Sequence, residues 1–362
     1  MMRGVICILA LLATSLSSCV SQNAQRKTEP LYTPRYASGF SVERDQESGA
    51  TLLRITDPWQ SAKEVVLYYD ITKPAQRIVT LSSSYVAMLD AIECTERIVG
   101  ISGTRFISTP SVKTKIEKGE ISEVGFDTVF DFERVKALGT DLVLLYGVAG
   151  ESKMLSDKLS ELNIPYIYIG DYLENDPLGK AEWVVALGYI CGCEERGQDI
   201  FKGIEERYLA TRESAQGTTN RPRVMLNTPY RDTWFMPPVG SYAVRLIEDA
   251  GGEYIYPQNT SSASKPISLE EAMLLTSKAD FWLNVGQCNS LAELRTAMPR
   301  FCDVKAVRNL CVYNNTLRST PSGGSDYWES GAIRPDVILA DLVKILHHKM
   351  PTDSLYYYRR LE

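Results

Sequence analysis

Residues 320–336 read TPSGGSDYWESGAIRPD and place an acid next to two large aromatic side chains. Glycine and serine crowd the start of this stretch, and such residues disfavour a buried helix or strand. Aromatic rings offer wide apolar faces on which a flat or apolar ligand can stack, and a nearby polar group can orient it. Core packing is the alternative for any single aromatic residue. We expect Asp326, Tyr327 and Trp328 to face a ligand, and the flexible flank makes the two aromatic residues the strongest candidates.

Further side chains that could touch the same ligand follow predicted strands. Arginine adds a planar fork of N–H donors that suits carboxylate, catecholate or hydroxamate oxygens. Trp234 lies in DTWFMPP, a segment that could also form the edge of a strand, so a structural role is the strongest alternative there. The candidates are Ser84, Tyr85, Arg105 and Tyr146 in the first half of the chain, and Tyr230, Arg231, Trp234, Tyr242 and Gln287 in the second.

The side chains that catalysis needs are not gathered in the sequence. His347 and His348 are the only histidines, and they adjoin each other at the end of the last predicted helix. No nucleophile elbow or phosphate-binding loop occurs. Glu270 and Glu271 are consecutive, and such helical residues point about 100° apart, so they do not face one substrate as a glycosidase pair does. The residues favour binding, with a glycosidase-like enzyme and a structural surface lipoprotein as distant alternatives.

Two stretches of alternating strand and helix patterns must position these side chains. In the first, short apolar strands such as RIVTLSS and DLVLLYG alternate with helices such as SYVAMLDAI. Strands that are apolar throughout, each followed by a helix, indicate a parallel sheet covered on both faces. The second stretch repeats this order with RPRVMLN, SYAVRLIEDAGG and ADFWLNVG. Ligands of such sheets lie at the carboxyl ends of the strands, so two facing sheets predict a ligand cleft between them.

The segment between the two halves carries a helical pattern and no strand pattern. Residues 178–220 are therefore predicted to form one long interlobe α-helix, interrupted at Gly192. The predicted fold class is α/β: two Rossmann-like lobes with parallel sheets, at residues 74–177 and 221–350, joined by that helix. Because a single helix is a stiffer hinge than several crossing strands, we expect only a modest closure of the lobes on binding.

Both ends of the chain lie outside the two lobes. Residues 1–18 combine a positive charge with an apolar run too short to span a bilayer, which indicates an export signal peptide. Cys19 ends the lipobox-like sequence LSSC, so we expect it to be lipidated and to anchor the protein on the periplasmic side of a bacterial membrane. The polar residues 19–36 then form a tether, and residues 37–73 form a β-hairpin with one further strand. The tail, residues 351–362, has no functional interpretation.

Composition narrows the class of protein further. The chain has 362 residues, of which 44% are hydrophobic and 23% charged, with a net charge of −6. These values are typical of a soluble globular protein, and an acidic balance without a basic block argues against nucleic acid as a partner. Beyond the signal peptide and the anchor, the pairing of the cysteines is open between one or two disulfides and buried free thiols. The cysteines concerned are Cys94, Cys191, Cys193, Cys288, Cys302 and Cys311.

The order of these segments resembles a known family, the periplasmic substrate-binding lipoproteins of ABC importers for iron complexes and vitamin B12. The matching segments include RIVTLSSSYVAMLDAI, DFERVKALGTDLVLL, ISLEEAMLLTSKADFWL and GGSDYWESGAIRPDVILADLVKILH, and the resemblance covers residues 74–350. It implies the two-lobe type with a single interlobe helix, acting as a monomer without a catalytic cofactor or a metal ion of its own. It also implies capture of a ferric siderophore or haem and delivery to a permease dimer with its cytoplasmic ATPase. Cobalamin or another corrinoid is the alternative ligand.

Two glutamates occupy equivalent places in the two halves. Glu133 in DFERVKAL and Glu270 in SLEEAMLL each lie in the first turn of a short predicted helix. A carboxylate there stabilises its own helix through the helix dipole by roughly 0.3–1 kcal/mol, which is a sufficient explanation for either residue alone. In the family that the chain resembles, one glutamate of each lobe contacts arginines of the permease. The resemblance therefore assigns permease docking to Glu133 and Glu270, with Glu271 as the fallback in the second half.

Overall fold

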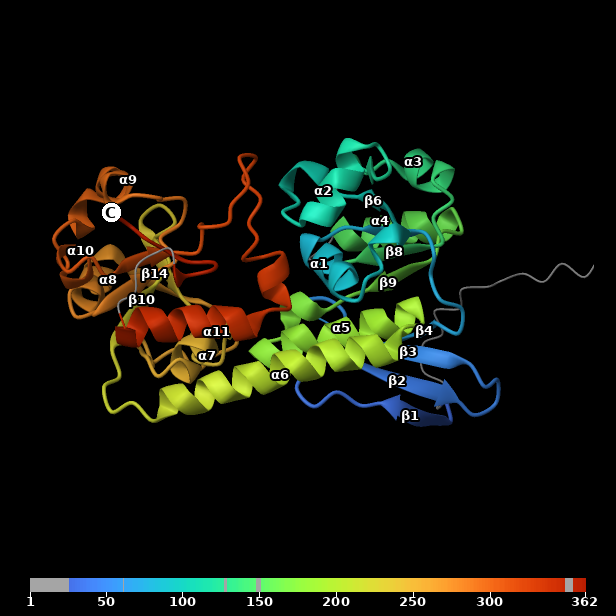
Figure 1. The fold of residues 1–362 in the computed structure, drawn as a ribbon, viewed down its shortest axis with the longest axis horizontal. Coiled ribbons are helices and arrows are strands. Elements are labelled where there is room, and N and C mark those ends of the chain that lie inside the picture. Colours follow the sequence, from blue (N-terminus) through green and yellow to red (C-terminus); the bar gives the residue numbers. More distant parts are fainter. Residues whose placement is uncertain (1–25, 61, 127–128, 148–150, 349–353) are drawn as a thin grey trace, which may run out of the picture.

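The computed structural model describes residues 26–362 except residues 61, 127–128, 148–150 and 349–353. The described chain forms two α/β lobes that lie side by side, and one long helix runs along both of them (Figure 1). None of the helices in this described part is both long and apolar enough to cross a bilayer. Cys19, the predicted signal peptide and the first part of the predicted tether lie outside the described residues.

The N-terminal lobe contains a parallel β-sheet of five strands. The strands are β5 (Ile78–Thr80), β6 (Ile98–Ile101), β7 (Ser122–Glu123), β8 (Leu142–Leu145) and β9 (Tyr166–Tyr168). Their spatial order is β7-β6-β5-β8-β9, and the three central strands are fully buried, as their continuous apolar runs predict. The helices that alternate with these strands are α1 (Ser83–Ala91), η1 (Thr95–Arg97), η2 (Thr104–Phe106), α2 (Pro110–Glu117), α3 (Phe132–Ala137), α4 (Glu151–Glu161) and η4 (Asp171–Leu173).

An antiparallel sheet of four strands precedes this lobe in the sequence. Its strands, in spatial order, are β1 (Thr28–Tyr32), β2 (Phe40–Asp45), β3 (Thr51–Thr56) and β4 (Val66–Asp70). The strands β2 to β4 lie in the segment 37–73, where we expected a hairpin and one further strand. The strand β1 is a correction, because it lies within residues 19–36, which we expected to be a tether.

Buried carboxylates explain why the chain is already ordered at β1. Glu182 accepts hydrogen bonds from the Tyr32 hydroxyl at 2.7 Å and from the backbone N–H groups of Tyr36 and Ala37, both at 2.8 Å. Glu205 accepts a further hydrogen bond from the Tyr36 hydroxyl at 2.7 Å. Because a buried carboxylate is costly unless donors surround it, these contacts fix the segment after β1 to the helices that carry the two glutamates.

Two helices, rather than one, occupy the stretch 178–220. The first, α5 (Pro177–Cys191), ends at Gly192, whose φ of 65° is the left-handed conformation that glycine adopts without strain. The second, α6 (Glu194–Gln216), runs back along α5 and continues to the C-terminal lobe, where it packs on α11 (Pro335–Val343) (Figure 1). Nearly all of α5 is buried, and it packs on α1 and β2. The prediction of one interrupted interlobe helix is corrected: α6 alone joins the lobes.

The C-terminal lobe contains a second five-stranded sheet. Its strands are β10 (Arg223–Leu226), β12 (Glu253–Tyr254), β14 (Phe281–Leu283), β15 (Val312–Asn314) and β16 (Arg359–Arg360). The spatial order is β12-β10-β14-β15-β16, and only β16 is antiparallel to its neighbour. The tail at 351–362 thus supplies the edge strand β16. The remaining elements are the antiparallel pair β11 (Thr233–Met236) and β13 (Lys265–Ser268), and α7 (Tyr242–Asp249), α8 (Leu269–Thr276), α9 (Leu291–Ala297), η5 (Pro299–Phe301), α10 (Lys305–Arg308), η6 (Ser330–Ala332) and η7 (Lys344–His348).

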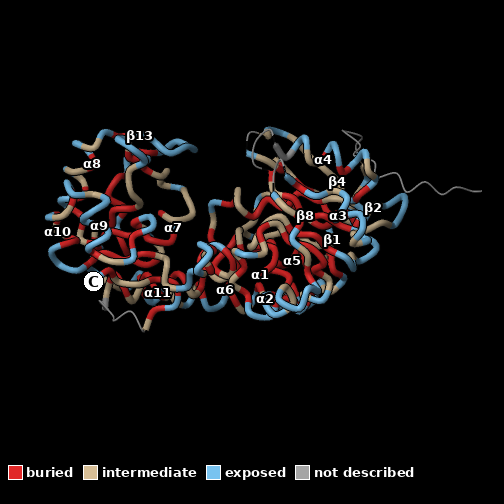
Figure 2. The backbone as a smooth tube through the Cα atoms, turned by 90° about the horizontal axis from the view of Figure 1, so that it is seen from above, coloured by how far each residue is buried: buried red, intermediate tan, exposed pale blue. Residues whose placement is uncertain are grey.

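Each lobe buries an apolar interior. Figure 2 shows buried residues running through the middle of both lobes, with exposed residues along the outer loops. The predicted α/β fold class, two lobes with parallel sheets joined by one long helix, is confirmed.

Candidate functional site

One loop of the C-terminal lobe reaches the N-terminal lobe. It comprises residues 315–329, between β15 and η6, and we call it the bridging loop; Figure 1 shows it rising between the lobes. Near its tip, Gly324 packs so closely on the other lobe that a Cβ atom there would lie 1.9 Å from the carbonyl oxygen of Phe106. Only glycine fits this contact, because any side chain would meet a backbone atom.

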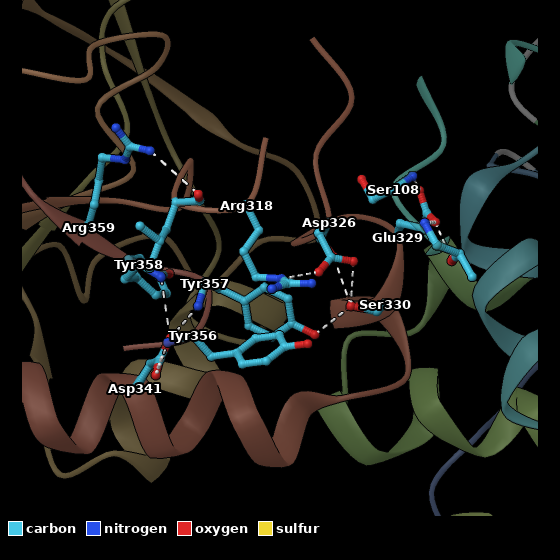
Figure 3. Close-up of polar contacts among 12 residues, drawn as sticks. Ser108, Arg318, Asp326, Glu329, Ser330, Asp341, Tyr356, Tyr357, Tyr358 and Arg359 are labelled. Carbon is cyan, nitrogen blue, oxygen red and sulfur yellow. Dashed lines mark hydrogen bonds and ion pairs between the residues drawn. The ribbon is translucent and has the colours of Figure 1, made fainter. Parts of the chain in front are cut away.

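Glu329, at the end of the bridging loop, binds the N-terminal lobe through hydrogen bonds. Its carboxylate accepts from the backbone N–H groups of Ser108 and Thr109, both at 2.7 Å, and from the Thr109 hydroxyl at 2.5 Å (Figure 3). The residue is 0% exposed, and burial raises the pKa of its carboxyl above the ordinary value of 4.5, although the hydrogen bonds act in the opposite direction. These bonds fix the loop against the residues that follow η2.

The C-terminal tail supports the bridging loop from its own lobe. Asp326 forms an ion pair with Arg318 at 2.5 Å and accepts a hydrogen bond from the Ser330 hydroxyl at 2.6 Å. The Ser330 hydroxyl also lies 2.8 Å from the Tyr357 hydroxyl of the tail (Figure 3). Asp341 on α11 accepts hydrogen bonds from the backbone of the tail, the shortest from the Tyr357 N–H at 2.7 Å. Asp326, which we expected to face the ligand, is instead a buried member of this network.

The two aromatic residues of the bridging loop differ in exposure. Tyr327 is 3% exposed, and its ring packs edge-on against those of Tyr357 and Tyr358, at centroid distances of 5.9 and 5.8 Å. Burial raises the pKa of Tyr327 to about 12. Trp328 is 59% exposed and lies 4.8 Å from the Tyr327 ring, edge to face. The prediction that both face a ligand is therefore wrong for Tyr327, because the tail tyrosines bury it, while the indole of Trp328 is available.

Two further predicted ligand residues belong to the core. Tyr85 on α1 is fully buried, and its hydroxyl donates a hydrogen bond to the Ile169 carbonyl at 3.0 Å. Trp234 on β11 is also fully buried, and its Nε1 donates to the Leu226 carbonyl at 2.9 Å. A buried ring whose polar atom is bonded to the backbone offers a ligand neither surface nor a donor. Both are corrections: the residues follow strands as predicted, but their side chains turn inward.

Besides Trp328, four of the predicted ligand residues are exposed. Arg105 in η2 has its guanidinium 4.5 Å from the centroid of the Phe106 ring, beside the contact with the bridging loop. Tyr230 is 66% exposed, and the Arg231 guanidinium lies 5.3 Å from its ring centroid. Gln287 is exposed after β14. The structure thus places Arg105 next to Phe106, which meets the bridging loop, and pairs Tyr230 with Arg231 in the C-terminal lobe.

The remaining three predicted residues offer less surface. Ser84 is buried at the start of α1, with its Oγ 2.9 Å from the Oγ of Ser82. Tyr146 is half-buried after β8. Tyr242 is half-buried at the start of α7, and burial raises the pKa of its hydroxyl well above the ordinary value.

Two asparagines at strand ends were not among the predicted residues. Asn227 follows β10 and Asn284 follows β14, and both have a positive φ, of 66° and 61°. The Oδ1 atom of Asn284 is buried and has no hydrogen-bond partner among the described residues. A hydrogen bond from a ligand to a buried, unpaired amide oxygen is stabilising, so Asn284 is an additional ligand-binding candidate. The sequence did contain a signal for these two asparagines, because the corresponding strands RPRVMLN and ADFWLNVG both carry Asn after Leu.

Metal-ligating side chains are not clustered in the part of the chain that the structure describes: no group of three or more His, Cys, Asp or Glu residues there could hold a metal ion. His347 packs in the C-terminal lobe, where its Nε2 lies 2.8 Å from the Ala250 carbonyl oxygen. The groups exposed at the strand ends and on the bridging loop are instead aromatic rings, guanidinium groups and an amide. Such groups can stack on an organic ligand and donate hydrogen bonds to it.

The two glutamates predicted to dock on a permease are both exposed. Glu133 lies in the first turn of α3, which Asp131 caps, and Glu270 in the first turn of α8, which Ser268 caps. The helix α3 belongs to one lobe and α8 to the other (Figure 1). Both carboxylates are therefore available to a partner, and docking itself stays a prediction.

Two lobes with parallel sheets, one long helix between them and a loop of one lobe that contacts the other are the architecture of the bilobed solute-binding proteins. The sequence model of the family described as "Periplasmic binding protein" matches residues 78–315, a stretch that includes strands of both sheets. The chain belongs to this periplasmic binding protein family, and the resemblance seen in its sequence is confirmed.

Similar proteins come from archaea and bacteria. An uncharacterized lipoprotein of Methanocaldococcus jannaschii is 25% identical over 286 residues, and the match spans 76% of this chain and 66% of that protein, just under two thirds of its length. A periplasmic haem-binding protein from Pseudomonas aeruginosa has a TM-score of 0.59 at 18% identity, covering 80% of this chain and 98% of its own. A periplasmic vitamin B12-binding protein of Vibrio cholerae has a TM-score of 0.54 at 15% identity, covering 75% and 97%. At these identities the two structures show a shared fold.

Proposed function

We propose that this protein is the substrate-binding component of an ABC importer and that it captures a metal chelate, either a ferric siderophore or haem, between its lobes. It binds its ligand without chemical change and passes it to a permease dimer served by a cytoplasmic ATPase. Membership of the periplasmic binding protein family, through a match that includes strands of both lobes, supports the transport role.

The exposed indole of Trp328 at the contact between the lobes is the observation that carries the choice of ligand. Trp328 adjoins Glu329, and Arg105 adjoins Phe106; Glu329 and Phe106 are both residues of the contact between the bridging loop and the N-terminal lobe. The indole and the guanidinium are therefore carried by residues next to this junction in the sequence. A flat chelate with carboxylate or catecholate oxygens would stack on the first and pair with the second.

A corrinoid such as cobalamin is the second candidate ligand, and two amides favour it. Asn284 has a buried Oδ1 without a partner among the described residues, and Gln287 is exposed nearby in sequence. A large and nearly neutral ligand binds through stacking and amide hydrogen bonds rather than through charge.

A titration of the purified protein with a panel of chelates tests the proposal. The panel consists of haemin, a ferric catecholate, a ferric hydroxamate and cyanocobalamin, each followed by its visible absorption. We expect one of them to bind, and Trp328→Ala to weaken binding at least tenfold, or about 1.4 kcal/mol. Arg105→Ala should weaken an anionic chelate and leave cyanocobalamin unaffected.

Met154→Ala is the matched control, because it also removes an exposed apolar side chain, on α4. Its affinity should equal that of the wild type. If no chelate of the panel binds, or if Trp328→Ala and Met154→Ala behave alike, the proposed ligand site is wrong.

Permease docking through Glu133 and Glu270 is tested by uptake. Each is changed to alanine, singly and together, and Glu195→Ala serves as the control because Glu195 is an exposed glutamate in the first turn of α6. Ligand affinity should hold in every variant while uptake falls most in the double variant, since charge pairs at such contacts steer and stabilise association. Wild-type uptake by the double variant would exclude this role.

The proposed lipid anchor is tested by fractionation. Cys19→Ala should release the protein from the membrane fraction, because one acylated cysteine is the only proposed link to the bilayer. Removal of the protein by protease added to intact cells would place it on the outer cell surface and contradict the periplasmic location.

A further inference from the structure

A turn of the N-terminal lobe meets a turn from a distant part of the chain, and each carries a cysteine. Cys94 lies in the turn between α1 and β6, and Cys193 lies in the turn between α5 and α6. Their sulfur atoms are 3.8 Å apart, although 99 positions separate the two residues in the sequence.

Two arginines fasten these turns to each other. Arg97, from the first turn, donates a hydrogen bond to the Cys191 carbonyl at 2.7 Å. Arg196, from the start of α6, donates to the Ile92 carbonyl at 3.3 Å and to the Glu93 carboxylate at 2.7 Å. Because each arginine binds the opposite turn, the backbones that carry Cys94 and Cys193 are held near each other.

We propose that Cys94 and Cys193 are an oxidative modification site, at which a disulfide bond joins the α1–β6 turn to the start of α6. An S–S bond is about 2.05 Å long, so the sulfur atoms, now 3.8 Å apart, must approach by less than about 2 Å. Both residues lie in turns, where a change of side-chain rotamer supplies that movement. The neighbouring Cys191 is fully buried in the last turn of α5 and remains a thiol.

The surroundings of Cys94 favour the reaction. A hydrogen bond from the Cys191 thiol lowers the pKa of Cys94 to about 6, and the positive charges of Arg97 and Arg196 act in the same direction. Burial raises the pKa of Cys193 to about 11, so Cys193 is the thiol of the pair and Cys94 the thiolate. Cys193 is partly exposed, and an oxidant can therefore reach it.

The oxidant is a disulfide, either glutathione disulfide or the active-site disulfide of a thiol oxidase for exported proteins. Cys193 loses its proton to solvent and attacks the oxidant, which releases one thiolate and leaves a mixed disulfide on Cys193. The Cys94 thiolate then attacks the Cys193 sulfur, which forms the Cys94–Cys193 bond and releases the second thiolate. The two protein sulfurs lose two electrons and the proton of Cys193, and the oxidant is reduced to two thiolates, which take up protons from solvent.

The bond would form only in an oxidising compartment, so its presence in cells rests on the proposed export of the chain. Its formation in the purified protein does not depend on export, on a ligand or on a permease. A link between residues 99 positions apart also restricts the unfolded chain strongly, so the oxidised protein should be the more stable form.

The test is oxidation of the purified full chain in a glutathione redox buffer, followed by alkylation and peptide mapping without reduction. We expect a cross-link between the peptides that contain Cys94 and Cys193, and a melting temperature higher than that of the reduced protein by roughly 5 °C or more. Cys302→Ser, which removes another partly exposed cysteine, should show the same cross-link and the same shift. Cys193→Ser should show neither, and Cys193→Ala replaces it if the serine variant does not fold.

Three results would overturn the proposal. The first is a wild-type protein that keeps every thiol reactive in the oxidising buffer. The second is a cross-link that uses Cys191 or any cysteine of the C-terminal lobe. The third is a stoichiometric zinc ion that protects Cys94, Cys191 and Cys193 together from alkylation. The same experiment on protein trapped in acid from its host cells then shows whether the bond forms after export.

Discussion

Replacing Glu329 with glutamine should loosen the contact between the lobes while α6 still joins them. The carboxylate accepts hydrogen bonds from two backbone N–H groups, of Ser108 and Thr109, and from the Thr109 hydroxyl, and it is fully buried. Glutamine has nearly the same shape but offers one acceptor oxygen and one NH₂ group. One of the two backbone N–H groups must then face a donor instead of an acceptor.

The size of the effect follows from that unpaired group. Burial already raises the pKa of Glu329, so loss of the negative charge alone removes little stabilisation. A buried N–H without an acceptor costs about 1–3 kcal/mol. If the bridging loop opens locally, the amides of Ser108 and Thr109 should exchange with solvent roughly 5- to 150-fold faster in Glu329→Gln than in the wild type.

Hydrogen–deuterium exchange with mass spectrometry measures this directly. Glu123→Gln is the matched control, because Glu123 also accepts backbone hydrogen bonds, from Gly103 at 2.9 Å and Thr104 at 2.7 Å, but entirely within the N-terminal lobe. The control should speed exchange at 103–104 and leave the bridging loop unchanged. The reasoning is refuted if Glu329→Gln leaves the exchange of 108–109 at the wild-type rate, or if both variants loosen the bridging loop equally.

Three further predictions concern the same region. Gly324→Ala should reproduce the exchange pattern of Glu329→Gln, because its Cβ would lie 1.9 Å from the Phe106 carbonyl oxygen; protection equal to wild type would show that the contact is not fixed. Tyr327→Ala should lower the free energy of unfolding by about 3–5 kcal/mol, as for other buried aromatic residues. Trp328→Ala should change it by less than about 1 kcal/mol. Denaturant titrations in which Trp328→Ala is the more destabilising change would contradict the assigned burial. The folded-state pKa of Glu329 is raised above 4.5, so its stabilising contribution is present below pH 4.5 and is lost as the pH rises through the folded pKa. The wild type should therefore lose stability relative to Glu329→Gln as the pH rises from 4.5 towards neutrality. A wild type that gains stability relative to Glu329→Gln over this range would contradict the direction of the shift.

The strand and helix pattern of both lobes could be predicted because it is local. Strands such as β8 are short apolar runs followed by a helical period, and this pattern specifies a parallel sheet wherever it occurs. The division of 178–220 was predictable only in part. Gly192 marks an interruption, but whether the chain continues or turns back depends on its φ, which composition does not fix.

Several errors at the site come from contacts between residues that are distant in the sequence. Tyr327 follows a glycine- and serine-rich segment, and that local composition suggested exposure, but Tyr357 and Tyr358 cover it from the far end of the chain. The segment after β1 has a polar composition typical of a tether, and it is ordered by Glu182, about 150 positions away. Glu329 was missed for the same reason, since its partners lie 220 positions earlier.

The position of the metal of a bound chelate is the most direct test of the proposed function. A crystal of the protein with the chelate selected by titration, measured at the absorption edge of its metal, gives that position as an anomalous difference peak. The proposal predicts one peak between the lobes, with the chelate in contact with the indole of Trp328 and, if it is anionic, with the guanidinium of Arg105. A peak on the outer surface, or enclosed within one lobe away from the bridging loop, would contradict it.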